Sequence, residues 1–132
     1  MPIPLAKTLP YILHTNRELG LMLSGKKPMA MFVDVKDFFH PVVSRYLRLF
    51  DRHVATGKLV RRDCHVGTIH HIYFALAGEE WRIDAMIELK SKDTWSENDE
   101  RREGELLGYE DWMNDHFLAL NKAAYPAPSG LP

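Results

Sequence analysis

The clearest alternation of apolar and polar positions in the chain lies in residues 69–89, which read IHHIYFALAGEEWRIDAMIEL. Two segments rich in β-branched and aromatic residues flank Gly78-Glu79. Glycine at the first of two turn positions suits a type II′ turn. The pattern therefore predicts a β-hairpin around which the rest of the fold is organised.

A two-residue turn fixes the register of this predicted hairpin. Leu76 is then opposite Trp81, and Tyr73 is opposite Asp84. Because side chains alternate between the two faces of a strand, one face becomes apolar and the other polar. We expect helices to pack on the apolar face, which carries Phe74, Ile83, Ala85 and Ile87.

The remaining periodicities predict two more strands and several helices. Residues 29–35 read as an edge strand, and residues 59–66 read as a strand that leads through Gly67 into the hairpin. Apolar residues at helical spacing follow Pro41, and Gly57 closes that helix. The predicted fold class is α+β, with a three- to four-stranded antiparallel sheet around a central hairpin and helices packed on one face.

Capping signals predict the other helices. Thr15 and Glu18 match a capping box, and Gly25 suits the left-handed cap at the end of a short helix. Ser96 with Asp99 begins a second helix, and a last amphipathic helix follows from residue 109.

Composition indicates one folded domain. The 132 residues are 45% hydrophobic and 27% charged, which predicts a domain over residues 1–125 with a flexible tail at 126–132. No apolar segment approaches the ~20 residues of a membrane span, and the first residues lack the pattern of a secretory signal. Cys64 is the single cysteine, which excludes an internal disulfide and a multi-cysteine metal site. We expect a cytoplasmic protein without a membrane association.

Charge is unevenly distributed along the chain. Residues 1–66 contain 11 Lys and Arg against 5 Asp and Glu, whereas residues 67–132 contain 6 against 13. One interpretation is a single solvated surface on which these charges neutralise each other. The other is a basic face that binds an acidic partner.

Four segments, NREL, KPMAMF, GEEWRIDAM and EGELLGYEDWMND, resemble those of small uncharacterised bacterial proteins of similar length. This resemblance implies a single-domain bacterial protein. No activity or functional residue is attached to that group.

Common catalytic motifs are missing from the sequence. It contains no Walker A loop, dinucleotide fingerprint, nucleophile elbow or HExxH pair. His70 and His71 are adjacent on a predicted strand, so they point to opposite faces and do not form a joint metal site. We therefore expect no cofactor and no bound metal.

One local pattern favours an enzyme. Glu88 and Lys90 resemble the ExK half of a PD-(D/E)xK nuclease core, in which an aspartate and the glutamate hold Mg²⁺ and the lysine steadies the attacking water. Asp63 is the candidate partner if its strand neighbours that of Glu88. Alternating charges on the wet face of a strand explain the same pattern without catalysis.

Two other residue sets suggest binding. One set lies on the polar face of the predicted hairpin and consists of His71, Tyr73, Arg82, Asp84 and Glu88. These side chains could bind a polar ligand or a basic partner, or they could form ordinary cross-strand ion pairs. A row of arginines, Arg45, Arg48 and Arg52, follows one side of a predicted helix. Such a row can contact the phosphates of a nucleic acid, but the near-neutral total charge of −1 argues against that role.

Aromatic residues concentrate near the C-terminus. Trp95, Tyr109, Trp112 and Phe117 lie within 23 residues, beside an acidic segment at 97–105. Aromatic anchors with a charged rim are typical of an interface, whereas the commoner arrangement places all four in the core. The leading hypothesis is a small interaction or regulatory module without catalysis of its own, which binds a protein partner or itself.

Overall fold

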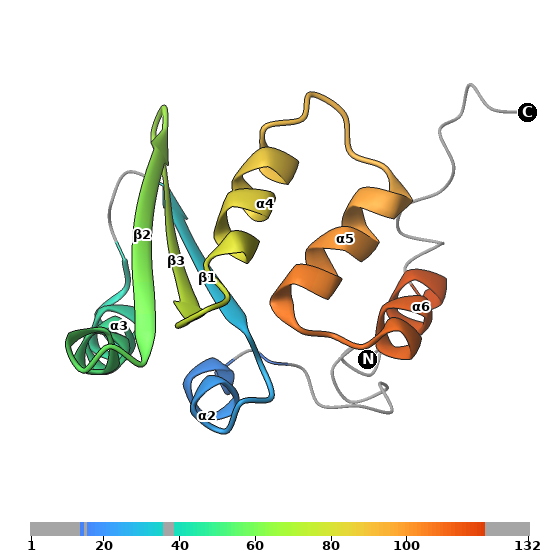
Figure 1. Ribbon diagram of the computed structural model, residues 1–132. Helices are drawn as coiled ribbons and strands as arrows, with labels where there is room; N and C mark the ends of the chain where they lie inside the picture. Colours follow the sequence, from blue (N-terminus) through green and yellow to red (C-terminus); the bar gives the residue numbers. More distant parts are fainter. Residues whose placement is uncertain (1–13, 15, 36–38, 121–132) are drawn as a thin grey trace, which may run out of the picture.

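A computed structural model describes residues 14, 16–35 and 39–120 (Figure 1). The described elements follow the order α2 (Glu18–Leu23), β1 (Met29–Val35), α3 (Pro41–Ala55), β2 (Leu59–Val66), β3 (Ile69–Leu76), α4 (Trp81–Lys90), α5 (Glu97–Leu107) and α6 (Asp111–Leu120). The predicted α+β class with an antiparallel sheet is confirmed. The predicted tail at 126–132 lies outside the described residues.

The sheet has the strand order β1-β3-β2, and both pairings are antiparallel. β3 is the central strand, and β1 lies at the edge as predicted. β2 and β3 form the hairpin of the fold through a tight turn at Gly67, whose φ of 61° is left-handed. The register places Val33 and Cys64 on either side of His71.

The predicted hairpin over residues 69–89 is wrong. Only its first half is a strand, because the chain from Trp81 to Lys90 forms helix α4. The predicted pairings of Leu76 with Trp81 and of Tyr73 with Asp84 therefore do not exist. Gly78, with a φ of 95°, lies in the connection from β3 to α4 instead of in a turn between two strands. Residues that favour a helix, namely Ala, Met, Leu, Glu and Lys, make up much of the segment.

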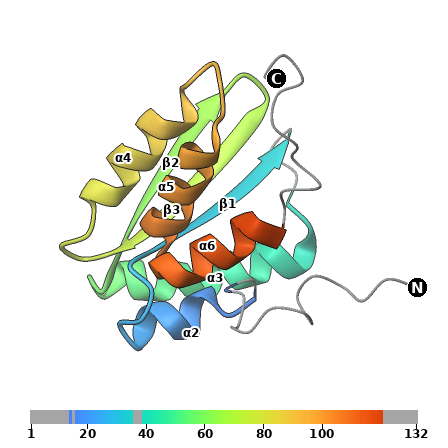
Figure 2. The same ribbon diagram turned by 90° about the vertical axis from the view of Figure 1, so that its right-hand side faces the viewer.

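Helices cover both faces of the sheet, whereas the sequence predicted one covered face. α3 packs on the face of Ile72 and Phe74, and α4 with α5 packs on the face of Tyr73 and Ala75 (Figure 2). The second covered face follows from the helical structure of residues 81–90, because α4 buries its apolar side against the sheet. α6 packs outside α5.

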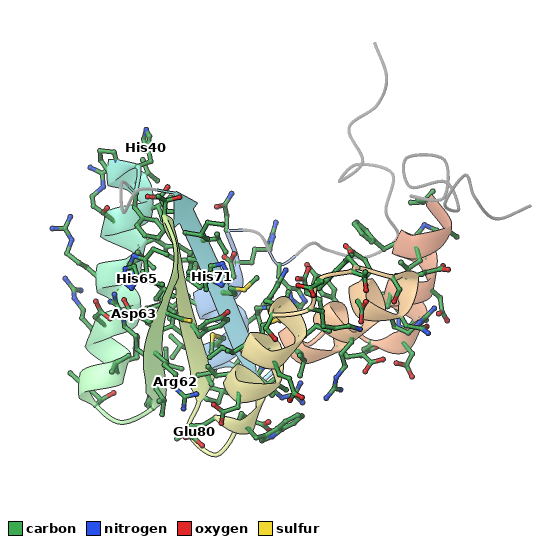
Figure 3. All side chains as sticks on the ribbon, turned by 90° about the horizontal axis from the view of Figure 1, so that it is seen from above. His40, Arg62, Asp63, His65, His71 and Glu80 are labelled. Carbon is green, nitrogen blue, oxygen red and sulfur yellow. The ribbon has the colours of Figure 1, made fainter. Side chains whose placement is uncertain are left out.

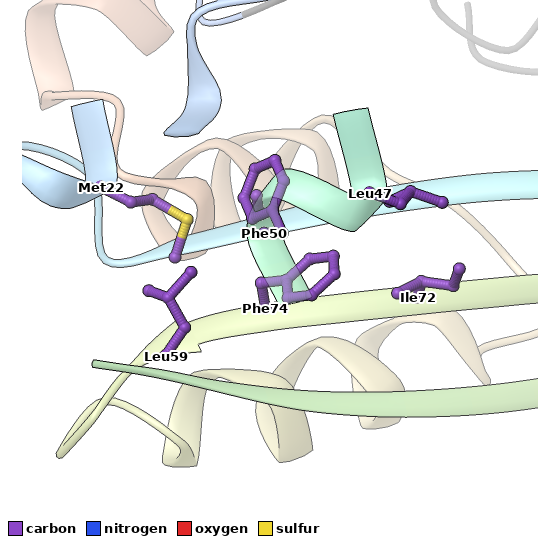
Figure 4. Close-up of a cluster of buried hydrophobic side chains, with 7 residues drawn as sticks. Met22, Leu47, Phe50, Leu59, Ile72 and Phe74 are labelled. Atoms are coloured by element: carbon purple, nitrogen blue, oxygen red, sulfur yellow. The ribbon is translucent and has the colours of Figure 1, made fainter. Parts of the chain in front are cut away.

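Two apolar cores result. In the first, the rings of Phe50 and Phe74 stack with centroids 4.5 Å apart. Its buried members are Met22, Ala30, Leu47, Phe50, Leu59, Ile72 and Phe74 (Figure 4). The second core consists of Met29, Tyr73, Ala75, Ile83, Met86, Leu89 and Leu106. Each fully buried aliphatic or aromatic side chain contributes roughly 1.5–3 kcal/mol relative to an exposed one.

Several predicted helix ends are confirmed. Pro41 is the first residue of α3, and Ser96 with Asp99 forms the capping box of α5. The start of α2 differs, because its N-cap is Arg17, and Glu18 instead accepts the hydroxyl of Tyr46 at 3.2 Å. Thr15, the predicted cap, is outside the described residues. No helix in the described part of the chain is long and apolar enough to cross a membrane.

Candidate functional site

One end of the sheet has an exposed apolar surface on the side of α4 and α5. Alternate residues of β3 face these helices, and their partners on β1 and β2 share that face. The helices cover the row of Tyr73, but the β2–β3 hairpin extends past the C-terminal end of α4 (Figure 1). Val66 and Ile69 of this hairpin are 62% and 38% exposed, and Val33 of β1 on the same face is 49% exposed. We call these three residues, with Cys64 and His71 beside them, the sheet-end surface.

A polar pair lies where the sheet-end surface meets the helices. His71 Nδ1 is 3.0 Å from the hydroxyl oxygen of Tyr73. Burial, and then the positive charge of Lys90, lowers the pKa of His71 below its ordinary value. Burial raises the pKa of Tyr73 to about 12. At neutral pH the pair therefore consists of an uncharged imidazole and a protonated phenol. The two groups share one hydrogen bond and carry no net charge.

Lys90 links this pair to α5 and to Trp95. Its ammonium forms an ion pair with Glu103 of α5 and lies 4.8 Å from the centre of the Trp95 ring. Trp95 is 42% exposed, and its indole N–H donates to Glu100. An exposed aromatic ring and an already neutralised lysine therefore border the end of the sheet.

The structure brings together only part of the predicted polar constellation. His71 and Tyr73 are hydrogen-bonded, but Tyr73 is fully buried and does not lie on a wet face. Arg82 lies on α4 and donates to the carbonyls of Glu105 and Leu106 at 3.0 and 3.2 Å. This arginine therefore ties α4 to the end of α5.

The two remaining acids of that constellation lie on the exposed side of α4. Asp84 forms an ion pair with Arg62 of β2, and Glu88 is solvent-exposed one helical turn further along. Their predicted places on a strand beside Tyr73 were wrong for the same reason as the hairpin.

The residues of the nuclease alternative are far from the arrangement that it requires. Glu88 and Lys90 are on a helix, so their side chains diverge, and Lys90 is paired with Glu103. Asp63 faces α3 from the opposite side of the sheet, as His65 does, whereas His71 faces α4 (Figure 3). Asp63 bonds Arg61 and His70, each at 2.8 Å, and the Arg61 guanidinium lowers the pKa of the Asp63 carboxyl.

The arginine row and the aromatic residues are largely exposed. Arg45, Arg48 and Arg52 all reach solvent from α3. Trp112 of α6 is 47% exposed. Tyr109 differs, because its ring stacks on that of His14 with centroids 3.7 Å apart and its hydroxyl accepts the His14 amide at 2.8 Å.

Sequence reasoning missed a buried lysine beside Tyr109. Lys27 is 2% exposed, and its Nζ lies 2.8 Å from His14 Nδ1 and donates to the carbonyl of Leu107 at 2.5 Å. Burial lowers the pKa of Lys27 to about 7. The sequence around it reads as an ordinary polar loop and carries no signal of this contact.

The sheet-end aliphatic residues were also missed. Val66 and Ile69 flank the turn of the β2–β3 hairpin, and their place beside Gly67 was the available signal. Within the described ranges, no three His, Cys, Asp or Glu side chains are placed to hold a metal ion. Comparisons with protein-family models, curated proteins and solved structures found no match to this chain.

Proposed function

We propose that this protein is a small interaction module that binds a protein partner through the sheet-end surface. The observation that carries the proposal is the exposure of aliphatic residues from all three strands on one face, with Val66 at 62%. Isolated exposed aliphatic residues are ordinary, but a contiguous set is typical of a binding surface.

The neighbouring polar groups support a protein partner over a charged small molecule. His71 and Tyr73 satisfy each other, and Glu103 neutralises Lys90. The sheet-end surface therefore has little charge to offer an ionic ligand. A partner segment with aliphatic or aromatic side chains would bury Val33, Val66 and Ile69, and Trp95 would form an aromatic edge of the contact.

The test begins with a photo-crosslinking amino acid placed at Val66 in the full chain. The labelled protein is irradiated in extract of the organism that encodes it, and adducts are identified by mass spectrometry. Leu23 of α2, which is 44% exposed, provides the control position. We expect a discrete adduct from Val66 that is missing from Leu23.

The identified partner is then purified and its Kd measured by calorimetry. Val66→Lys and Ile69→Lys should each weaken binding by about tenfold or more, which corresponds to about 1.4 kcal/mol. Leu23→Lys adds the same charge and should leave the Kd unchanged. Failure to obtain an adduct at Val66, or a Kd that both lysine variants leave intact, would contradict the proposal.

A further inference from the structure

The outer face of α3 is basic and partly apolar. Arg45, Arg48 and Arg52 are exposed there, together with Val42 and Leu49 at 56% and 41%. Asp51 is the one acid in this helix. It does not neutralise the three arginines, because it accepts a hydrogen bond from Arg61 of β2 at 2.9 Å. We call these five exposed residues the basic face.

The outer side of α6 has the opposite charge. Asp111 and Asp115 are exposed, and Asp115 keeps 62% of its side chain exposed even though it pairs with Arg101. Trp112 and Leu120 are 47% and 42% exposed on the same helix. We call Asp111, Trp112, Asp115 and Leu120 the acidic face.

These two faces lie at opposite ends of the molecule. The order of layers is α3, sheet, α4 and α5, then α6 (Figure 1), and the perpendicular view places α6 nearest and α3 farthest (Figure 2). The basic face and the acidic face of one chain therefore cannot meet each other. Each can meet the complementary face of another copy.

We propose that the protein self-associates head to tail, with the basic face of one copy on the acidic face of the next. Both faces combine charge with exposed apolar side chains, so the charges would align the copies and the apolar groups would be buried between them. The net charge of −1 opposes this approach very little. Because the two surfaces differ, each copy in a pair still has one of its two faces unoccupied. Further copies can therefore add until a ring closes, or they can continue as an open chain.

Such contacts depend on salt. Exposed ion pairs are individually weak and are screened beyond about 10 Å at 0.1 M salt. We therefore expect reversible association that is strongest at low ionic strength. This inference does not depend on the sheet-end surface, so Val66→Lys should leave self-association intact even where it abolishes partner binding.

Sedimentation equilibrium of the full chain tests the proposal, with circular dichroism to verify that each variant is folded. The wild-type mass should rise with protein concentration at about 50 mM salt and return to that of the monomer at about 500 mM. The triple variant Arg45→Glu, Arg48→Glu, Arg52→Glu should remain monomeric. The double variant Asp111→Lys, Asp115→Lys should also remain monomeric.

A mixture of the two reversed variants gives the sharpest result. The acidic α3 of the first then complements the basic α6 of the second, and the unaltered faces remain complementary, so the equimolar mixture should associate again. The matched control is Arg17→Glu, Lys26→Glu, Lys58→Glu, which changes the net charge equally at exposed positions outside α3. It should associate more strongly than the α3 variant.

Three results would overturn the proposal. One is a wild-type chain that stays monomeric at low salt, and another is a control as monomeric as the α3 variant, which would reduce the effect to net charge. The third is a monomeric wild type that binds a fluorescent DNA duplex, with binding lost in the α3 variant. That outcome would assign the arginines to nucleic acid.

Discussion

The ammonium nitrogen of Lys27 lies 2.5 Å from the carbonyl oxygen of Leu107 and is almost completely shielded from solvent. The lysine follows α2 in sequence, and the carbonyl is the last of α5, so this hydrogen bond joins the segment after α2 to the end of α5. A lysine at a helix C-terminus satisfies carbonyls that have no partner within the helix. The cost is that its charge is buried.

This burial predicts a pH-dependent stability. The pKa of Lys27 is lowered from 10.5 to about 7, chiefly by burial. Between these values the unfolded chain binds a proton that the folded chain does not, so the free energy of unfolding rises with pH. From pH 7 to pH 9 the rise should reach at most about 2.5 kcal/mol, at 1.36 kcal/mol per unit. Urea unfolding of wild type and Lys27→Met across this range measures it.

The Lys27→Met variant should lose most of that pH dependence. His14, Glu18 and Tyr109 are the titratable groups that face the amine, and the pKa of His14 is lowered to about 4, so His14 does not titrate above pH 7. A variant with the same slope as wild type would show that another group is responsible.

Gly104 of α5 lies against Asn114 of α6, and this contact predicts the effect of a larger residue at position 104 on stability. A Cβ at this position would lie 2.9 Å from Asn114 Cγ and still closer to the amide oxygen. Alanine normally favours a helix by about 1 kcal/mol over glycine, but overpacking costs about 1–3 kcal/mol. We expect Gly104→Ala to destabilise the protein in urea unfolding. In a protein that already carries Asn114→Ala, the Gly104→Ala substitution should destabilise less. If the free-energy changes of the two substitutions simply add in the double variant, the proposed clash is contradicted.

The polar pair at the end of the sheet gives a spectroscopic prediction. The charge of Lys90 lowers the pKa of His71, after the larger effect of burial. Lys90→Met should therefore raise this pKa but leave it below the ordinary value, as followed by NMR titration of the imidazole. Lys92→Met is the control, because Lys92 pairs with Asp99. An equal shift in both variants would argue against the arrangement around Lys90.

Glu88, one of the two exposed acids of α4, tests the nuclease alternative. Glu88→Gln should change stability by no more than about 0.5 kcal/mol, as for an ordinary surface substitution. Purified wild type and variant should behave alike when incubated with DNA or RNA and Mg²⁺. Cleavage by the wild type that disappears in Glu88→Gln would refute the view that this protein has no catalysis of its own.

Local signals in the sequence predicted much of the fold. Pro41 and Gly57 marked the main helix, Ser96 and Asp99 marked the start of α5, and the strand over residues 59–66 was predicted with its observed bounds. These signals act within a few residues, so they can be read without the tertiary structure. The burial of Lys27 depends on a contact 80 residues away and could not be predicted in this way.

The candidate site was predicted only in part for the same kind of reason. His71, Tyr73 and Trp95 were among the predicted binding residues and lie within or beside the sheet-end surface, but the exposure of Val66 and Ile69 depends on where α4 ends. With residues 81–90 predicted as a strand, the polar cluster was assigned to an open face. One wrong element therefore displaced most of the predicted site.

The segment from Trp81 to Lys90 was ambiguous because its apolar residues fit both periods. Ile83, Ala85 and Ile87 alternate as in a strand, whereas Ile83 and Met86 are spaced for one side of a helix. The exposure of Met86 distinguishes the helix from the strand, since the predicted hairpin would place this side chain on the solvent-exposed face and α4 buries it completely. Trp81 behaves in the opposite way, because the hairpin would bury it and α4 leaves it 50% exposed.

Two alanine variants therefore test α4. Met86→Ala should cost about 2–4 kcal/mol, as other truncations of buried methionine or leucine do. Trp81→Ala should cost no more than about 1 kcal/mol, since the ring contributes mainly a stacking contact with the Arg82 guanidinium at 4.6 Å. Urea unfolding of both variants measures these changes. A large loss for Trp81→Ala with a small one for Met86→Ala would favour the strand, because only a strand would bury the indole and expose the thioether.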